Sequence, residues 1–183
     1  KAKGITSEFK SAIVTPLWDF FLFCDVVVAS NNQKQVLTKG ERQLNQVQWI
    51  LHDGIGYLFP APVNVNLSNQ MQKGSWFIAN HQSDTPKDEI SKDVFKLWID
   101  HGPQPTGASY QYIVIPSTNE KELEAQGNRS ISILANTTDI QAVTNRNLGI
   151  SQVVFYTSGE IKISPELTIG IDSPGLVMVK TEG

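Results

Sequence analysis

The sequence predicts an all-β fold, a large antiparallel β-sandwich with one short helix, and three observations support this prediction. Short segments rich in Val, Ile, Phe and Trp recur along the chain, turn residues separate them at regular intervals, and helix signals are confined to a single segment. Aromatic and β-branched side chains suit a pleated, half-buried surface, and many short strands with regular turns are typical of sandwiches. The length of 183 residues fits one domain, or one domain with part of a second.

The first half of the chain is expected to consist mainly of strands. Residues 18–23 and 26–29 predict a hairpin, and residues 30–33 predict the polar loop that follows it. Residues 80–92 are polar and charged, which indicates a surface loop. The further strands expected in this half are residues 36–38, 44–51, 57–59, 63–67, 94–99 and 110–115.

Glycine and proline mark the two ends of the strand predicted at residues 57–59. Gly54 and Gly56 indicate a tight turn or bulge that leads into it. Pro60 and Pro62 are expected to end it, because proline lacks the N–H group that a sheet ladder needs.

Residues 117–125 are the one segment with helix signals. A capping residue precedes Glu120 and Glu122 in the first turn, and Gly127 follows the last turn. The helix should be short and external. After it, strands are expected at residues 131–135, 140–143, 152–156, 160–163, 167–171 and 176–180.

The turn at residues 172–175 is the candidate domain boundary. It contains Pro174 and Gly175, leads into a strand, and is followed almost at once by the end of the sequence. We therefore expect a sandwich domain over residues 1–171, with residues 172–183 forming a closing strand or the start of a truncated C-terminal domain.

Charge and composition exclude some classes of partner. The net charge is −3, and no basic run could follow a phosphate backbone, so nucleic acid is not an expected partner. The most apolar stretch, residues 12–29, is interrupted by Pro16, Asp19 and Asp25, so no membrane span is expected. The single cysteine, Cys24, excludes an internal disulfide and is expected to be a buried, inert thiol.

The histidines, His52, His81 and His101, are candidate catalytic residues that we expect to be structural or to lie in loops. His52 precedes Asp53 and His101 follows Asp100, but neighbours in a strand point to opposite faces and cannot pair within it. A dyad would need the histidine of one strand and the aspartate of another. We therefore assign no catalytic residue.

The sequence contains no recognisable motif for a metal site, a dinucleotide cofactor or nucleophilic hydrolysis. Asp84, Asp88 and Glu89 carry the oxygen ligands that calcium prefers, but they lack the alternation of a calcium loop and indicate a solvated acidic loop. Gly54 and Gly56 lead into a strand, which does not fit a dinucleotide motif, and there is no G-x-S-x-G elbow. We expect no metal site and no cofactor, and nucleophilic hydrolysis is unsupported.

The tryptophans are the residues that a sugar-binding surface would use, because an indole ring can stack on the apolar face of a pyranose. Trp18, Trp49 and Trp98 lie in strongly apolar strands and are expected to be core residues. Trp76 follows a Gly-Ser turn and is the candidate substrate-binding residue.

Several sequence blocks stand out by their order along the chain. The central ones are residues 52–60 (HDGIGYLFP), 74–76 (GSW), 97–102 (LWIDHG) and 108–116 (ASYQYIVIP), and the outer ones are residues 18–28, 135–143 and 172–179. In this order they resemble the central β-sandwich region of polysaccharide lyase family 8, which includes chondroitin AC, hyaluronate and xanthan lyases. One departure is Ser30-Asn31-Asn32, where the family usually carries glycine.

The resemblance implies a supersandwich-like fold and a role in cleaving uronic-acid-containing polysaccharides by β-elimination. In the family, an Asn neutralises the uronate carboxylate, and a Tyr with a nearby His serves as base and then as acid. Those residues lie in a helical toroid that precedes the β region, and no position of this chain matches them. The resemblance therefore implies no catalytic residue here and a helical catalytic domain elsewhere in the same polypeptide.

The sequence thus predicts the non-catalytic β-sandwich portion of a polysaccharide lyase, inactive by itself, with an acidic polysaccharide of chondroitin or hyaluronan type as its partner. The resemblance also implies a secreted or periplasmic protein. The alternative is a free-standing carbohydrate-binding or surface interaction domain, which would expose a row of aromatic side chains on one sheet face. A hydrolase of the same sandwich type ranks last.

Overall fold

The computed structural model describes residues 8–16, 26–125 and 130–181, and for residues 8–16 it describes the backbone. The strand expected at residues 18–23, Trp18 and Cys24 lie outside the described residues. The chain divides into two compact units, Lys1–Glu124 and Ala125–Gly183, and each is described by itself. Strands dominate both units and pair antiparallel, which confirms the predicted fold class.

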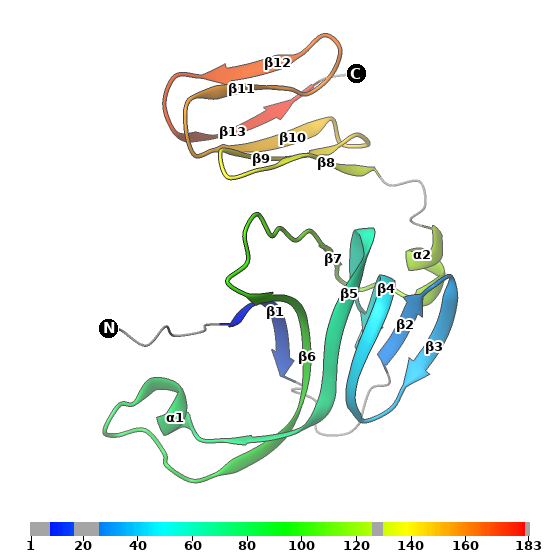
Figure 1. Cartoon of the computed structure of the whole chain (residues 1–183), viewed down its shortest axis with the longest axis vertical. Helices are drawn as coiled ribbons and strands as arrows, with labels where there is room; N and C mark the ends of the chain where they lie inside the picture. The colour runs from blue at the N-terminus through cyan, green and yellow to red at the C-terminus, as the bar shows by residue number, and fades with distance from the viewer. Residues whose placement is uncertain (1–7, 17–25, 126–129, 182–183) are drawn as a thin grey trace. The chain divides into compact units, whose positions relative to one another are not determined.

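In the described part of the first unit, seven strands form one antiparallel sheet (Figure 1). Their order is β1-β6-β5-β4-β2-β3, and β7 pairs with β5 outside this path. The strands are β1 (Glu8–Pro16), β2 (Val26–Ser30), β3 (Gln33–Leu37), β4 (Gly40–His52), β5 (Ile55–Gly74), β6 (Ile90–Pro103) and β7 (Ile113–Ile115).

Tight two-residue turns connect the first hairpins of this sheet. Ser30 pairs with Gln33, and Asn31 and Asn32 between them have φ of 50° and 60°. Positive φ at both central positions is the hairpin geometry that matches strand twist, and asparagine tolerates it better than most residues. The Asn-Asn turn therefore needs no glycine. Asp53 and Gly54 form the corresponding turn between β4 and β5, as the glycine signal predicted.

The prediction that Pro60 and Pro62 end a strand is wrong, because β5 continues through both to Gly74. The pairing of β5 with β4 explains how the strand accommodates two prolines. Leu58 pairs with Trp49, and Val63 pairs with Val47, so four residues of β5 lie opposite Gln48 alone. Both prolines lie in this bulge, where the ladder does not require their missing N–H groups.

Both faces of the sheet are buried around β4 and β5. One face carries the larger core cluster, which includes Val28, Ile50, Tyr57, Phe95 and Leu97. The other face carries a cluster whose buried members are Ala29, Trp49, Leu58 and Leu123. Adjacent residues of one strand enter different clusters because side chains alternate across a strand. Trp49 is a core residue, as predicted, and Trp98 is partly buried.

The predicted helix is present as α2 (Glu120–Ala125), and its N-terminus is held by side chains. Asn119 Oδ1 accepts a hydrogen bond from the Glu122 N–H at 3.1 Å. On its buried side, Leu123 packs against Trp49 and Leu58. Lys34 on β3 forms ion pairs with Glu120 and Glu124, at 3.0 and 2.8 Å, so α2 is tied to the sheet on its exposed side as well.

A second helix, α1 (Trp76–Asn80), lies in the connection between β5 and β6, where the sequence analysis expected a turn and a loop. Ser75 caps it by accepting a hydrogen bond from the Ile78 N–H at 3.3 Å, and His81 ends it with φ of 56°. Five residues are too few to show helical periodicity, which is why the prediction of one helix missed it.

In the second unit, a four-stranded sheet of order β13-β10-β9-β8 packs against a two-stranded ribbon, β11-β12 (Figure 1). Ala142, Val153 and Phe155 are buried between them. The strands are β8 (Ile131–Asn136), β9 (Ile140–Asn145), β10 (Ile150–Phe155), β11 (Gly159–Lys162), β12 (Thr168–Ile171) and β13 (Gly175–Lys180).

The two units differ from the division at residue 172 that the turn signals suggested. β13 pairs with β10 along its whole length, from Gly175 with Phe155 to Lys180 with Ile150. Residues 175–180 are therefore an edge strand of the second unit's own sheet. The change from one unit to the other falls after Glu124, at the end of α2.

The close packing at Gly56 provides a test of this fold. A Cβ atom there would lie 2.6 Å from Leu123 Cδ2 and 2.9 Å from Thr118 Cγ2, and both neighbours are buried. We expect Gly56→Ala to lower the free energy of unfolding by about 1–3 kcal/mol through overpacking, measured by urea denaturation. Gly74→Ala is the control, because its Cβ would meet nothing within 4 Å. Equal stability of the two variants would contradict the packing of α2 on β5.

Candidate functional site

The first candidate site is the tip of the long β5–β6 hairpin, where α1 lies (Figure 1). Trp76 begins the helix and is 55% exposed, and Ile78 is 66% exposed. The neighbouring Phe77 ring is held by the edge of His81, with ring centroids 5.7 Å apart, and by Lys87 Nζ, 5.0 Å from its centroid. These contacts fix the helix and leave the Trp76 indole available to solvent.

The second candidate site comprises the last residues of β6 and the loop that follows them, at the other end of that strand from α1. His101, Tyr110 and Tyr112 form a row of three rings: the first two centroids are 6.1 Å apart, and the two tyrosine centroids are 6.2 Å apart. The tyrosine rings are nearly parallel, with 17° between their planes, and are 51% and 39% exposed. The sequence analysis placed both tyrosines in a strand and did not single them out.

His52 is a core residue and is inaccessible to a substrate. Its ring is fully buried and stacks on Phe95, with centroids 4.3 Å apart and planes within 8°. Neither ring nitrogen has a hydrogen-bond partner in the structure. Burial lowers the pKa of His52 below its ordinary value of 6.5, and the charge of Asp53 opposes this only in part. The structure therefore gives His52 the structural role that we expected.

His52 does not form a dyad with Asp53, because neither of its ring nitrogens has a hydrogen-bond partner in the structure. Asp53 lies in the exposed turn that follows His52, and its backbone has a positive φ of 49°. Asp100 Oδ1 accepts a hydrogen bond from the Gly102 N–H at 2.9 Å, which fixes the start of the loop after β6. His81 ends α1 and contacts Phe77. His81 and His101 thus lie beside aromatic rings.

Within the described residues, no group of three or more His, Cys, Asp or Glu side chains is placed to hold a metal ion. Of the acidic residues considered for calcium, Glu89 forms an exposed ion pair with Lys73 at 2.7 Å. This places Glu89 on the surface of the β5–β6 hairpin.

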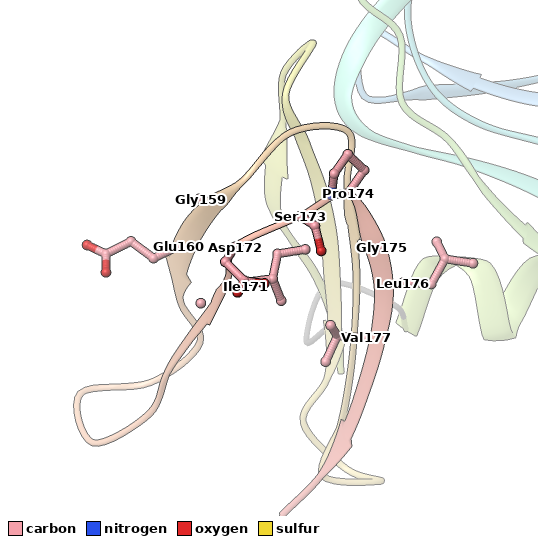
Figure 2. Close-up of a pocket in the computed structure, with 10 residues that line it drawn as sticks. Gly159, Glu160, Ile171, Asp172, Ser173, Pro174, Gly175, Leu176 and Val177 are labelled. Carbon is pink, nitrogen blue, oxygen red and sulfur yellow. The ribbon is translucent and has the colours of Figure 1, made fainter.

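The second unit contains an open groove of about 840 Å³ between the β11–β12 ribbon and the start of β13 (Figure 2). Its polar lining includes Glu160, Asp172 and Ser173. In Figure 2 the Glu160 side chain points away from Asp172, so the two carboxylates do not converge on one point. The groove therefore lacks the paired carboxylates that glycoside hydrolysis requires.

Comparison with known proteins adds two family matches that follow the two units. Residues 2–127 match polysaccharide lyase family 8, super-sandwich domain, and residues 132–183 match polysaccharide lyase family 8, C-terminal beta-sandwich domain. The fold and both matches define a β-sandwich region of a polysaccharide lyase. The chain belongs to polysaccharide lyase family 8, as the sequence blocks indicated.

Curated relatives are bacterial lyases. Chondroitinase-AC of Pedobacter heparinus is 44% identical over 133 residues, which are 72% of this chain and 19% of that protein. Hyaluronate lyase of Thermasporomyces composti is 31% identical over 136 residues, which are 73% of this chain and 17% of that protein. The chain therefore spans about a fifth of the length of these relatives.

Solved structures share the fold. A chondroitinase AC lyase, solved in complexes with oligosaccharides, superimposes with a TM-score of 0.80 and 35% identity, covering 96% of this chain and 25% of that one. A xanthan lyase of Paenibacillus superimposes with a TM-score of 0.75 and 23% identity, covering 87% of this chain and 16% of that one. At that lower identity, the second match shows the fold alone.

The burial of His52 predicts a pH dependence of stability. Because its pKa is lowered in the folded state, the unfolded chain takes up a proton below about pH 6.5 that the folded chain does not. Stability should therefore fall with pH below about 6.5, by up to about 1.4 kcal/mol per pH unit from this residue. The measurement is urea denaturation between about pH 7 and pH 5.

Replacing the residue separates its contribution from those of other groups. His52→Leu should flatten this part of the pH profile, because the core position no longer titrates. His81→Asn, at an exposed histidine with φ of 56°, is the matched control and should keep the wild-type profile. If the two variants gave the same profile, His52 would not be the titrating group.

Proposed function

We propose that this chain is the non-catalytic β-sandwich portion of a polysaccharide lyase that cleaves uronic-acid-containing polysaccharides, of chondroitin or hyaluronan type, by β-elimination. The observation that supports it most is the order of the two family matches, super-sandwich domain and then C-terminal domain, in register with the two units. The relatives with the highest identities quoted above are named for chondroitin and hyaluronate.

The surroundings of the titratable side chains support a role without catalysis. β-Elimination needs a base that can reach the proton beside the uronate carboxylate. His52 is buried, and His81 and His101 lie beside aromatic rings. Among the described residues, no group of three or more His, Cys, Asp or Glu side chains is placed to hold a metal ion. We propose that the catalytic groups belong to a helical domain of the same polypeptide, which this sandwich supports.

The acidic polysaccharide is the proposed partner, and Trp76 is the proposed contact from this chain. Its indole is the most exposed of the described tryptophans and is fixed by a capped helix, so stacking on a sugar would cost little conformational entropy. Such polymers are too large to enter a cell intact, which favours a secreted or periplasmic protein. No helix among the described residues is long and apolar enough to cross a membrane.

A chimera tests the supporting role. The segment of the chondroitinase AC lyase that superimposes on this chain would be replaced by residues 1–183. We expect the chimera to keep activity within about tenfold of the parent enzyme, because a scaffold affects the barrier only indirectly. The separate chain should be inactive. The assay is the ultraviolet absorbance of the unsaturated uronate product during incubation with chondroitin and hyaluronan.

Two outcomes would contradict this proposal. A chimera that folds and assembles but has lost its activity would show that this sandwich cannot support the lyase. Rising absorbance with the separate chain would show that it carries its own active site. Binding of the polymer by the separate chain, without chemistry and without a functional chimera, would favour the alternative of a carbohydrate-binding module.

The role of Trp76 is tested by calorimetric titration of the chain with chondroitin oligosaccharides. Trp76→Ala should weaken binding about tenfold, because aromatic anchors contribute most of the affinity at such contacts. Ile78→Ala is the matched control, since this side chain is exposed on the same helix. Equal affinity of both variants would remove Trp76 from the binding surface.

A further inference from the structure

Side-chain alternation places an aromatic row on the outer side of β7. Ile113 and Ile115 point inward, where both pack against the cluster formed by Trp49, Leu58 and Leu123. Val114 between them is 48% exposed, and the same alternation directs Tyr112 to the side of Val114. The contact between the Tyr110 and Tyr112 rings keeps Tyr110 on this side. The outward row is thus held by the inward anchoring of β7.

These tyrosines end a long exposed loop that carries no helix or strand, residues 104–112. Loops that a rigid sheet holds in place often carry the binding residues of a protein. Two large rings half-exposed on such a loop contribute little to the core beneath it. Exposed aromatic patches with a polar rim mark interaction sites, and here Ser109 and Gln111 supply polar side chains beside the rings.

Charge selects the kind of ligand that fits this surface. Residues 101–119 contain no Asp, Glu, Lys or Arg. The nearest carboxylate in sequence, Asp100, already accepts the Gly102 N–H. This segment therefore offers a ligand no carboxylate and no Lys or Arg cation of its own. Recognition by its side chains comes from ring faces and neutral hydrogen bonds, which suits a sugar ring better than a phosphate or sulfate group.

We propose that Tyr110 and Tyr112 form a stacking platform for the pyranose rings of a uronic-acid-containing polysaccharide. The inference rests on the proposed function, because it takes the polymer class from there. It is separate from the Trp76 contact: α1 precedes the start of β6 at Ile90, whereas the platform follows its end at Pro103. At about 3.3 Å per residue, β6 separates the two by several sugar lengths.

The hydroxyl of Tyr110, beside His101, raises the rival possibility that the residue binds the ligand by a hydrogen bond, and the same variants decide between the two modes of binding. Stacking depends on the ring face and tolerates loss of the hydroxyl. A hydrogen bond depends on the hydroxyl itself. Tyr110→Phe should therefore keep the affinity of the platform, whereas Tyr110→Ala should lose it.

The experiment titrates the whole chain with unsulfated chondroitin hexasaccharide by calorimetry, in a Trp76→Ala background, so that binding at α1 does not contribute. We expect Tyr110→Ala and Tyr112→Ala, each added to this background, to bind about tenfold more weakly than the Trp76→Ala chain. Tyr156→Ala is the matched control, because Tyr156 is also 51% exposed and lies in the second unit. The loss of affinity should be the same at about 0.1 M and about 1 M salt. At about 1 M salt the Debye length is about 3 Å, which weakens contacts between charges but not ring stacking.

A second measurement needs no variant. In proton NMR spectra of the wild-type chain, the ring resonances of Tyr110 and Tyr112 should shift on adding the hexasaccharide, while those of Tyr156 should not. This result would support the platform even if an alanine variant failed to fold, which far-ultraviolet circular dichroism would reveal.

Three results would overturn the platform. They are unchanged affinity on adding Tyr110→Ala and Tyr112→Ala together to a folded Trp76→Ala chain, loss of affinity in Tyr110→Phe as large as in Tyr110→Ala, and absence of any heat and any NMR shift with the wild-type chain. Each leaves the supporting role intact if the chimera is active, so failure of the platform and failure of the proposed function are distinguishable.

Discussion

The register of β5 is the constraint on which the first unit depends. This strand pairs with β4 along one edge and with β6 and β7 in succession along the other. A shift by one residue would exchange the two buried faces, sending Tyr57 and Phe59 to the side of Leu58. The Asp53-Gly54 turn sets the register at one end, and the bulge at Pro60 and Pro62 resets it midway. The positions of α2 and β7 follow from that register, because both pack on the face that Leu58 defines.

The sequence was informative where a local rule decided the structure. Alternating apolar residues located most strands to within a few positions, and the early acidic residues located α2. It failed where a neighbouring strand decided the outcome. Pro60 and Pro62 read as strand breakers because their ladder position, opposite Gln48 alone, exists only once β4 is in place. The boundary after Glu124 was missed for a similar reason, since β13 belongs to the second unit through its pairing with β10.

The candidate site was predictable to a lesser extent. Trp76 is a candidate because of the Gly-Ser turn before it, and the structure leaves its ring exposed. In the sequence, Tyr110 and Tyr112 contributed only to the alternation that predicts a strand. The contact between their rings depends on the conformation of the loop, which the sequence pattern does not show. One signal in the sequence was available: aromatic residues at alternate positions beside a charge-free run of residues 101–119. The burial of His52 against Phe95 is equally invisible from sequence, because the two residues lie on different strands.

Net charge limits what this chain can contribute to the handling of an acidic polymer. A surface of net charge −3 repels a uronate chain at long range, and the basic groups near the hairpin tip are partly paired, as Lys73 is with Glu89. Neutralising the carboxylate, which makes the neighbouring proton acidic, needs donors or cations held close to it. The contribution that we propose for this chain is apolar: exposed rings that contact sugar faces without competing for charge. This proposal assigns neutralisation of the carboxylate to the helical domain that we propose in the same polypeptide.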